Sequence, residues 1–398
     1  MTTRAYFDHN ATAPVRPEAA QAVARALVAT GNPSSIHGEG RAARALVEEA
    51  RADVARLVHA KPGEVVFTSG GTEAANLALH VAKSSLGVER LVVSAIEHDC
   101  VRVAASALGL PVAVAPVDAN GVVDLDALGE LLSRPGKPLL ALMLANNETG
   151  VVQPVVEAVD LAGGTGAIVL TDAIQAIGRM RVDFNALGVD MLLASAHKIG
   201  GPQGAGALVV REGHAFSPLL QGGGQESRRR AGTENVPGIA GFGAAAILAI
   251  EDYKQMPRIL ALRTRLETGV RAAAPDAVIF GERAPRLANT SLFAASGLDA
   301  ETLIMALDLD GLAVSAGSAC SSGKVSRSHV LAAMGVGDAL AKAAIRVSLG
   351  SDNTEADIDR LVASWSRMAK RAQEKMTSEK VTSEKASADK SALAEVEH

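Results

Sequence analysis

The stretch that decides the fold is GAIVLTDAIQ at 166–175 with DMLLASAHK at 190–198. Each begins with an apolar run of strand length and ends in polar residues: Asp172 and Gln175 in the first, Ser195, His197 and Lys198 in the second. Apolar runs of this length are typical of buried parallel strands. Four further runs follow the same pattern: EVVFTSGG (64–71), RLVVSAIEH (90–98), PLLALMLANNETG (138–150) and GALVV (206–210).

Helical patterns separate these runs. Residues 38–58, for example, carry apolar side chains at helical spacing with charges on the opposite face, as a helix that covers a sheet does. The sequence therefore predicts an α/β fold. Ligands of open α/β sheets bind beyond the carboxyl ends of the strands, so we expect the polar residues at these ends to meet in one pocket.

The pattern changes near residue 250. A long helix at 251–270 is predicted to lead into a smaller C-terminal domain, in which 277–281 and 289–293 are strands, 302–309 is a helix and 354–368 a final helix. Thr354 and Asp357 fit the start of that last helix. The tail beyond 373 repeats TSEK and has no aromatic residue, so we expect 374–398 to be disordered.

Composition and charge exclude several classes of function. The chain has 398 residues and a net charge of −5, which argues against a nucleic-acid-binding protein. No apolar run is long enough for a membrane span and the N-terminus lacks a secretory signal, so we expect a cytoplasmic protein without membrane contact. The only two cysteines, Cys100 and Cys320, exclude a disulfide framework and a four-thiol zinc site, and no metal is expected.

Three elements of the sequence favour one chemistry. Ser69–Glu73 (SGGTE) joins a predicted strand to a helix, and the N–H groups of such a turn suit a phosphate, although these turns are often purely structural. Taken alone, Asp172 could be a helix cap and Lys198 a solvated loop lysine. Together, a phosphate cup, a carboxylate for a ring nitrogen and a strand-end lysine are the parts needed to hold pyridoxal 5′-phosphate.

The sequence resembles the cysteine desulfurases of the NifS/IscS group, which are fold type I pyridoxal-phosphate enzymes of aminotransferase class V, over residues 5–372. The resemblance rests on these motifs: YFDHNATAPV (6–15), GNPSSIHGEGRAA (31–43), FTSGGTEAANLA (67–78), EHDCV (97–101), ANNETGVVQP (145–154), TDAIQAIG (171–178), SAHKIGGPQGAGAL (195–208), GGGQESRRRAGTENV (222–236), SAGSACSSG (315–323) and IRVSLG (345–350). One departure lies at His9-Asn10, where the family often has Tyr-Ser or Asn-Ala.

The resemblance implies an architecture. It predicts a large cofactor-binding domain at 16–250, with a mostly parallel seven-stranded sheet flanked by helices. A smaller α+β domain is predicted from 1–15 and 251–373, and this domain carries a mobile loop with Cys320. It also implies a homodimer with a shared active site.

The resemblance further implies roles for single residues. Lys198 is the Schiff-base lysine, Asp172 the partner of the ring nitrogen, Gln175 the partner of the phenolic oxygen, and His98 the ring stacked on the cofactor and a proton shuttle. Asn147 contacts both cofactor and substrate, and Arg346 binds the substrate carboxylate. The phosphate is bound by Gly71, Thr72, Ser195 and His197, together with Thr233 from the other subunit.

Cys320 aligns with the catalytic cysteine. Its Gly- and Ser-rich surroundings suit a moving loop, whereas Cys100 begins an apolar helix and is predicted to be a dispensable buried residue. The implied reaction converts L-cysteine to L-alanine and a Cys320 persulfide, for an iron–sulfur scaffold or another sulfur acceptor. The alternatives are a selenocysteine lyase or other pyridoxal-phosphate lyase, which would not need Cys320, and a non-catalytic sulfur-relay partner.

Overall fold

The computed structural model describes residues 4–317 and 327–396. Its large sheet has seven strands in the order β2-β8-β7-β6-β5-β3-β4. All neighbouring pairs are parallel except those made by β8, which is antiparallel to both β7 and β2. The strands of this sheet are β2 (Val65–Thr68), β3 (Arg90–Ser94), β4 (Val112–Ala115), β5 (Pro138–Ala141), β6 (Ile168–Asp172), β7 (Met191–Ser195) and β8 (Gly206–Val210). The predicted fold class is therefore confirmed.

Two details of the sheet correct the sequence analysis. GALVV at 206–210 was predicted to be parallel, but the connection 196–205 is shorter than the roughly dozen residues that a parallel crossover needs, so β8 returns antiparallel to β7. Strand β4 was not predicted, because Val112 and Val114 are exposed and the segment lacks a continuous buried run.

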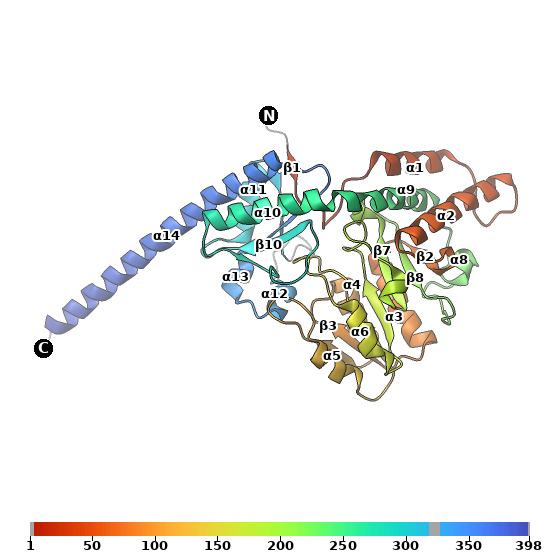
Figure 1. Cartoon of the computed structure of the whole chain (residues 1–398), viewed down its shortest axis with the longest axis horizontal. Helices are drawn as coiled ribbons and strands as arrows, with labels where there is room; N and C mark the ends of the chain where they lie inside the picture. Colours follow the sequence, from red (N-terminus) through yellow and green to blue (C-terminus); the bar gives the residue numbers. More distant parts are fainter. Residues whose placement is uncertain (1–3, 318–326, 397–398) are drawn as a thin grey trace.

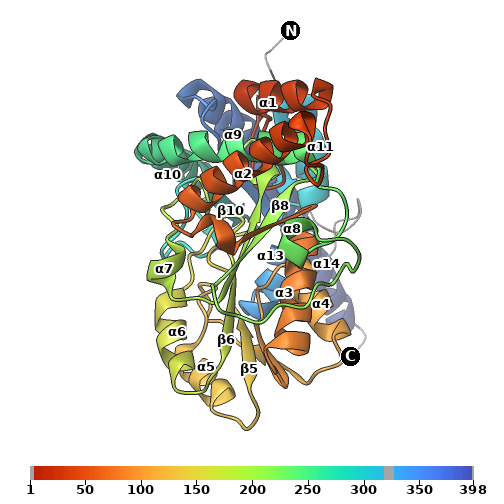
Figure 2. The same cartoon turned by 90° about the vertical axis from the view of Figure 1, so that its right-hand side faces the viewer.

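Helices cover both faces of the large sheet. Figure 2 shows α5, α6 and α7 on one side of the strands and α3 and α4 on the other. Each face has its own buried apolar cluster. The helices of this part are α1 (Pro17–Val28), α2 (Gly38–Leu57), α3 (Gly71–Ser85), α4 (Asp99–Ala107), α5 (Leu125–Leu132), α6 (Val155–Gly163), α7 (Phe184–Leu187), α8 (Gln225–Arg228) and α9 (Val236–Asp252).

A second apolar core lies around the C-terminal elements. A four-stranded antiparallel sheet has the order β12-β13-β10-β9, and β1 pairs with β11 in a two-stranded parallel sheet. The elements are β1 (Ala5–Tyr6), α10 (Met256–Ala273), β9 (Val278–Ile279), β10 (Thr290–Ala294), α11 (Ala300–Leu309), β11 (Leu312–Ala313), β12 (Ser315–Ala316), α12 (His329–Ala333), α13 (Asp338–Lys342), β13 (Ile345–Ser348) and α14 (Glu355–Val396).

The N-terminal strand joins this C-terminal part, as the sequence analysis expects of residues 1–15. Figure 1 shows β1 beside α11, although the two elements are far apart in the sequence. Phe7 is completely buried and packs in the same apolar cluster as Trp365 of α14. The boundaries at 16 and 250 stay predictions.

The last helix is longer than predicted. Its start is the predicted one, because Thr354 Oγ1 accepts from the Asp357 N–H and the Asp357 carboxylate accepts from the Thr354 N–H. The helix continues to Val396, where disorder was expected for 374–398, and in Figure 1 its end extends away from the rest of the chain. Ala, Glu and Lys have high helix propensities, so this tail can be helical without a core of its own.

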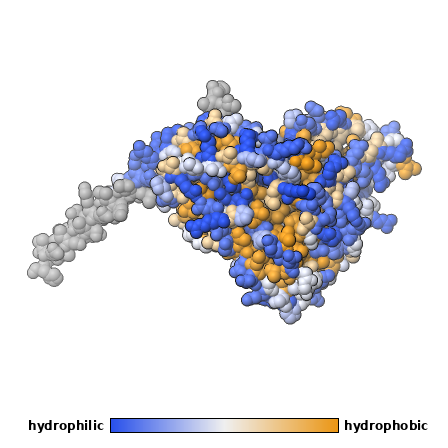
Figure 3. Space-filling model, in the orientation of Figure 1, coloured by the Kyte–Doolittle hydropathy of each residue, from blue (hydrophilic) through white to orange (hydrophobic). Residues whose placement is uncertain are grey.

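Within the described residues 4–317 and 327–396, one stretch is long and apolar enough to cross a membrane, Val236–Ala273. Half of its most apolar window is buried. Its first part is α9, which buries Ile239 and Phe242 in the core of the large sheet and contacts α1 and α2. We conclude that this is a core helix. Figure 3 shows hydrophilic side chains over much of the surface in this view, with apolar ones gathered near the middle.

Candidate active site

A cavity of about 320 Å³ lies at the carboxyl ends of the parallel strands, within the range of small-molecule and cofactor sites. The ends of five strands of the large sheet, β2, β3, β5, β6 and β7, contribute to its wall, together with β13 and the N-terminal segment. The lining residues are Asn10, Ala11, Gly71, Thr72, His98, Cys100, Met143, Ala145, Asn147, Asp172, Ile174, Gln175, Ser195, His197, Lys198 and Arg346.

Ten of the twelve residues that the sequence analysis singled out line this cavity. The two exceptions are Thr233 and Cys320. Thr233 lies in a separate cavity beside Ser69 and Arg230, and Cys320 lies outside the described residues. The structure therefore brings together the predicted cofactor and substrate residues of one chain.

One end of the cavity is built to receive an anion. Gly71 and Thr72 begin α3, and the N–H groups in the first turn of a helix have no helical acceptor. The glycines allow close packing here, because a Cβ at Gly206 would lie 2.7 Å from the Gly70 backbone and one at Gly71 would lie 2.4 Å from Ile174 Cδ1. The donor chemistry and shape of this turn fit a phosphate group.

His197 and Ser195 complete this end of the cavity. Ser195 is the last residue of β7, and His197 Nδ1 lies 3.3 Å from Thr12 Oγ1. Burial, reinforced by Lys198 and Arg179, lowers the pKa of His197 to about 4. A neutral imidazole therefore faces the cavity at physiological pH, and it acts there through a hydrogen bond and not through a full charge.

Asp172 is the last residue of β6 and is buried. Its Oδ1 accepts from the Ile174 N–H at 2.9 Å. Burial raises the pKa of the carboxyl, while the Ile174 N–H, His98 and Lys198 act in the opposite direction. A buried carboxylate in this position is stabilised by a nearby cation, and a protonated ring nitrogen meets that requirement.

Lys198 ends the short 3₁₀ turn Ala196–Lys198 that follows β7. The ammonium group donates to the carbonyl oxygens of Asn10 at 2.6 Å and Ala11 at 2.7 Å. Lys198 lines the cavity, so the reading of it as a solvated loop lysine is wrong. The side chain lies where an amine can reach a molecule bound beside Asp172.

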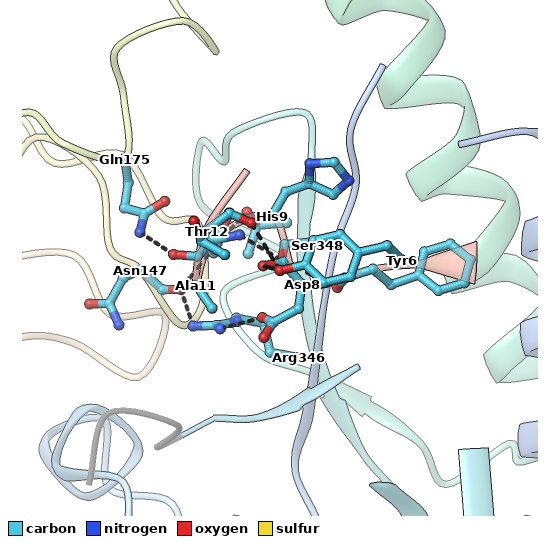
Figure 4. A network of polar contacts seen from close by, with 12 residues as sticks. Tyr6, Asp8, His9, Ala11, Thr12, Asn147, Gln175, Arg346 and Ser348 are labelled. Carbon is cyan, nitrogen blue, oxygen red and sulfur yellow. Dashed lines mark hydrogen bonds and ion pairs between the residues drawn. The ribbon is translucent and has the colours of Figure 1, made fainter. Parts of the chain in front are cut away.

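Arg346 lies opposite, on β13, and is almost completely buried, with 2% of its side chain exposed. Figure 4 shows its guanidinium between Asn147 and Asp8. Nη1 donates to the Asn147 carbonyl at 3.0 Å, and Nη2 donates to Asp8 Oδ1 at 2.8 Å. A buried guanidinium that lines a cavity suits a carboxylate ligand.

The sequence analysis missed the segment Asp8–Thr12 as part of the site. The backbone carbonyl of Asn10 accepts hydrogen bonds from Lys198 Nζ and from Gln175 Nε2. The side-chain amide of Asn10 donates to the Asn147 carbonyl and to Thr290 Oγ1. Only the unusual His9-Asn10 pair in the sequence pointed to this region. The contacts themselves join residues up to 338 positions apart, which no local pattern reveals.

Two buried carboxylates near the cavity were also missed. Burial, reinforced by Asp172, raises the pKa of Glu97 to about 8, although its Oε1 accepts from the Met143 N–H. Burial raises the pKa of Glu148 to about 7, against the effect of Ser328 Oγ, which donates to it at 2.6 Å. Their position directly after the predicted strands, in IEH and NNET, was the available signal.

Cys100 is buried near the start of α4, and its side chain also lines the cavity. Its backbone N–H donates to His98 Nδ1 at 3.2 Å, so His98 caps this helix. Burial is the main cause that raises the pKa of the Cys100 thiol. Because the thiolate is the nucleophilic form, Cys100 is poorly suited to attack a substrate.

Comparison with known proteins places this site in a family. The family model for aminotransferase class V matches residues 5–361. A cysteine desulfurase of Cereibacter sphaeroides is 44% identical over 366 residues, which cover 90% of this chain and 94% of the relative. The chain belongs to the class V aminotransferases and, among them, to the cysteine desulfurases. Enzymes of this family depend on pyridoxal phosphate, which confirms the family and cofactor that the sequence analysis predicted.

Further relatives agree. The cysteine desulfurase IscS of Dictyoglomus turgidum is 40% identical, with 90% of this chain and 93% of the relative covered. The X-ray structure of a NifS-like protein from Rickettsia africae ESF-5 matches with a TM-score of 0.85 and 34% identity over 92% of this chain and 99% of that one. The names of these relatives do not favour the alternative of a selenocysteine lyase.

Proposed function

We propose that this family member takes sulfur from L-cysteine, releases L-alanine and leaves the sulfur on Cys320 as a persulfide. The observation that carries the proposal is the meeting of Asp172, Lys198 and Arg346 around one cavity. These residues supply the three contacts that a pyridoxal-phosphate enzyme acting on an amino acid needs. The relatives named cysteine desulfurase support L-cysteine as the amino acid.

Different residues of the chain are assigned to different parts of the cofactor. The first turn of α3, Ser195 and His197 are placed to take the phosphate, Asp172 the ring nitrogen and Lys198 the aldehyde carbon. Gln175 is assigned to the ring oxygen, Asn147 to contact with both cofactor and substrate, and His98 to the ring face. When bound, pyridoxal phosphate supplies an electron sink for the bonds at the substrate Cα.

The substrate steps are assigned to three side chains. Arg346 binds the carboxylate of L-cysteine and thereby orients its Cα. Lys198 Nζ, released from the cofactor, takes the Cα proton, with His98 as the group that moves a proton near the substrate sulfur. The Cys320 thiolate attacks that sulfur and the bond between sulfur and Cβ breaks. A proton added at Cβ, and the return of a proton to Cα by Lys198, complete L-alanine.

The wider context stays part of the proposal. We expect a homodimer in which Thr233 of one subunit reaches the phosphate of the other. We also expect a cytoplasmic location and transfer of the persulfide sulfur to an iron–sulfur scaffold or another acceptor protein. The relative named cysteine desulfurase IscS supports the iron–sulfur alternative.

Stoichiometry tests the proposal. Purified enzyme loaded with pyridoxal phosphate is incubated with L-cysteine and excess dithiothreitol, and L-alanine and sulfide are quantified. Equal amounts of the two products are expected. Pyruvate and ammonia in place of L-alanine would instead identify a β-eliminase and overturn the proposal.

A further inference from the structure

The guanidinium of Arg346 is fixed on two of its nitrogens. Nη2 donates to Asp8 Oδ1 at 2.8 Å and Nη1 donates to the Asn147 carbonyl at 3.0 Å. The third nitrogen, Nε, is buried and has no hydrogen-bond partner within the described part of the chain. A buried N–H without an acceptor is costly. A guanidinium has five N–H groups, so Nε–H and one N–H on each Nη are the donors that these two contacts leave for a ligand.

Asp8 itself does not line the cavity, whereas Arg346 does. The aspartate therefore contacts the guanidinium from outside the ligand space. In Figure 4 the two side chains face each other, away from Gln175. Asp8 is thus in a position to orient Arg346 but not to contact the substrate.

The backbone around Asp8 is held firmly. Its carbonyl accepts from Tyr6 Oη at 3.0 Å and from the Ala11 N–H at 3.0 Å, and Asp8 forms a β-bridge with Ser348, two residues beyond Arg346. These contacts fix the carboxylate relative to β13. The side chain of Asp8 is 20% exposed, so the ion pair with Arg346 is largely shielded from water.

The surroundings of Arg346 also require a counter-charge. Arg179 is a second buried cation, and burial together with Arg346 lowers its pKa to about 9. Glu148 is the other acidic group near Arg346, but burial keeps its pKa at about 7, so it is only partly ionised at neutral pH. Asp8 is the acid that forms an ion pair with Arg346.

We propose that Asp8 is a positioning residue that holds the guanidinium of Arg346 so that its remaining N–H groups receive the α-carboxylate of the amino-acid substrate. This inference rests on the proposed function, in which Arg346 binds that carboxylate. It assigns to the N-terminal segment a part in substrate affinity, although the segment is distant in sequence from the other site residues. The effect of Asp8 should be transmitted entirely through Arg346.

A double-mutant cycle tests the inference. KM and kcat for L-cysteine, and the dissociation constant of L-alanine by calorimetry, are measured for Asp8→Asn, Arg346→Ala and the double variant. Asp8→Asn is expected to raise KM and the dissociation constant about tenfold, the effect of losing a charge-assisted contact. Its kcat and cofactor content should stay within about twofold of wild type. The double variant should be no weaker than Arg346→Ala alone.

Two further variants serve as controls. Asp352→Asn removes an exposed carboxylate, 64% exposed beside His9, that is not bonded to Arg346, and it should bind L-alanine as the wild type does. Asp8→Glu keeps the charge on a longer side chain and should restore binding only in part. If Asp8→Asn does not fold, Asp8→Glu still tests the inference. Wild-type affinity for L-alanine in Asp8→Glu would contradict the claim that the position of the Asp8 carboxylate matters.

The outcomes separate this inference from the proposed function. If Arg346→Ala leaves the affinity for L-cysteine and L-alanine unchanged, the carboxylate site of the proposed function is wrong, and the inference falls with it. If Arg346→Ala weakens binding but Asp8→Asn behaves like Asp352→Asn, only the inference is overturned. Additive losses in the double variant would also overturn it, because Asp8 would then act independently of Arg346.

Discussion

The cavity has two walls of different origin. One wall consists of the ends of neighbouring strands, where Asp172 and Lys198 follow β6 and β7. The other consists of the segment Asp8–Thr12 and of β13, whose ion pair Asp8–Arg346 joins residues 338 positions apart. In the proposed function, the sheet wall supplies the groups for cofactor chemistry and the other wall supplies the groups for substrate affinity. Variants on the two walls should therefore separate kcat from KM.

The largest effect is expected on the sheet wall. Lys198→Ala should lower L-alanine formation by about 10³-fold or more, because the proposed Cα base is removed. The variant should also lose the visible absorbance of the bound cofactor. Absorbance spectra and an L-alanine assay measure both effects. Wild-type turnover by Lys198→Ala would contradict the assignment of catalysis to the sheet wall.

The next effect belongs to the opposite wall. Arg346→Ala should raise KM for L-cysteine by about 10- to 100-fold, which corresponds to the loss of a charge-assisted contact of about 1.5–3 kcal/mol. The cofactor should remain bound, and Arg346→Lys should recover only part of the affinity, since an ammonium lacks the planar fork. Saturation kinetics with unchanged KM in the Ala variant would show that this wall does not bind the substrate.

Thr233 lies on neither wall within one chain. It therefore tests whether a second subunit contributes to the site. If it completes the site of a second subunit, mixing inactive Lys198→Ala and Thr233→Ala subunits should restore roughly a quarter of wild-type activity, because half of randomly paired dimers are mixed and each has one intact site. Sedimentation gives the oligomeric state. A monomer at the assay concentration would refute a shared site.

The smallest effect on turnover is expected for Glu97→Gln, which keeps the acceptor for the Met143 N–H. The pKa of Glu97 is raised to about 8 in the folded chain from 4.5. The folded state thus favours the protonated acid, and this stabilisation is lost as the pH rises toward 8. Glu97 should therefore contribute a fall of about 1.4 kcal/mol per pH unit to the free energy of unfolding over this range, a contribution that Glu97→Gln lacks. Denaturant titrations at pH 5, 6, 7 and 8 measure the difference; parallel curves for both proteins would contradict the raised pKa.

The two walls also differ in how far the sequence predicts them. The sheet wall was predictable because each apolar run ends in polar residues, and parallel strands bring such ends to one edge. The direction of β8 was missed, because its apolar run carries no information on the direction of pairing and the signal lay in the short connection 196–205. Asp8 and Asn10 were missed because their contacts with Arg346, Lys198 and Thr290 depend on the packing of the two domains.

The central claim is that sulfur passes from L-cysteine to Cys320 and not to the other cysteine. Cys100 lines the cavity but is buried with a raised pKa, so Cys100→Ala should turn over like the wild type. The direct measurement is the mass of the intact enzyme after one turnover with L-cysteine in the absence of reductant, followed by peptide mapping. The account predicts the mass of one added sulfur atom on the Cys320 peptide and none in Cys320→Ala, which should form almost no L-alanine. Added sulfur on the Cys100 peptide alone, or full L-alanine production by Cys320→Ala, would contradict it.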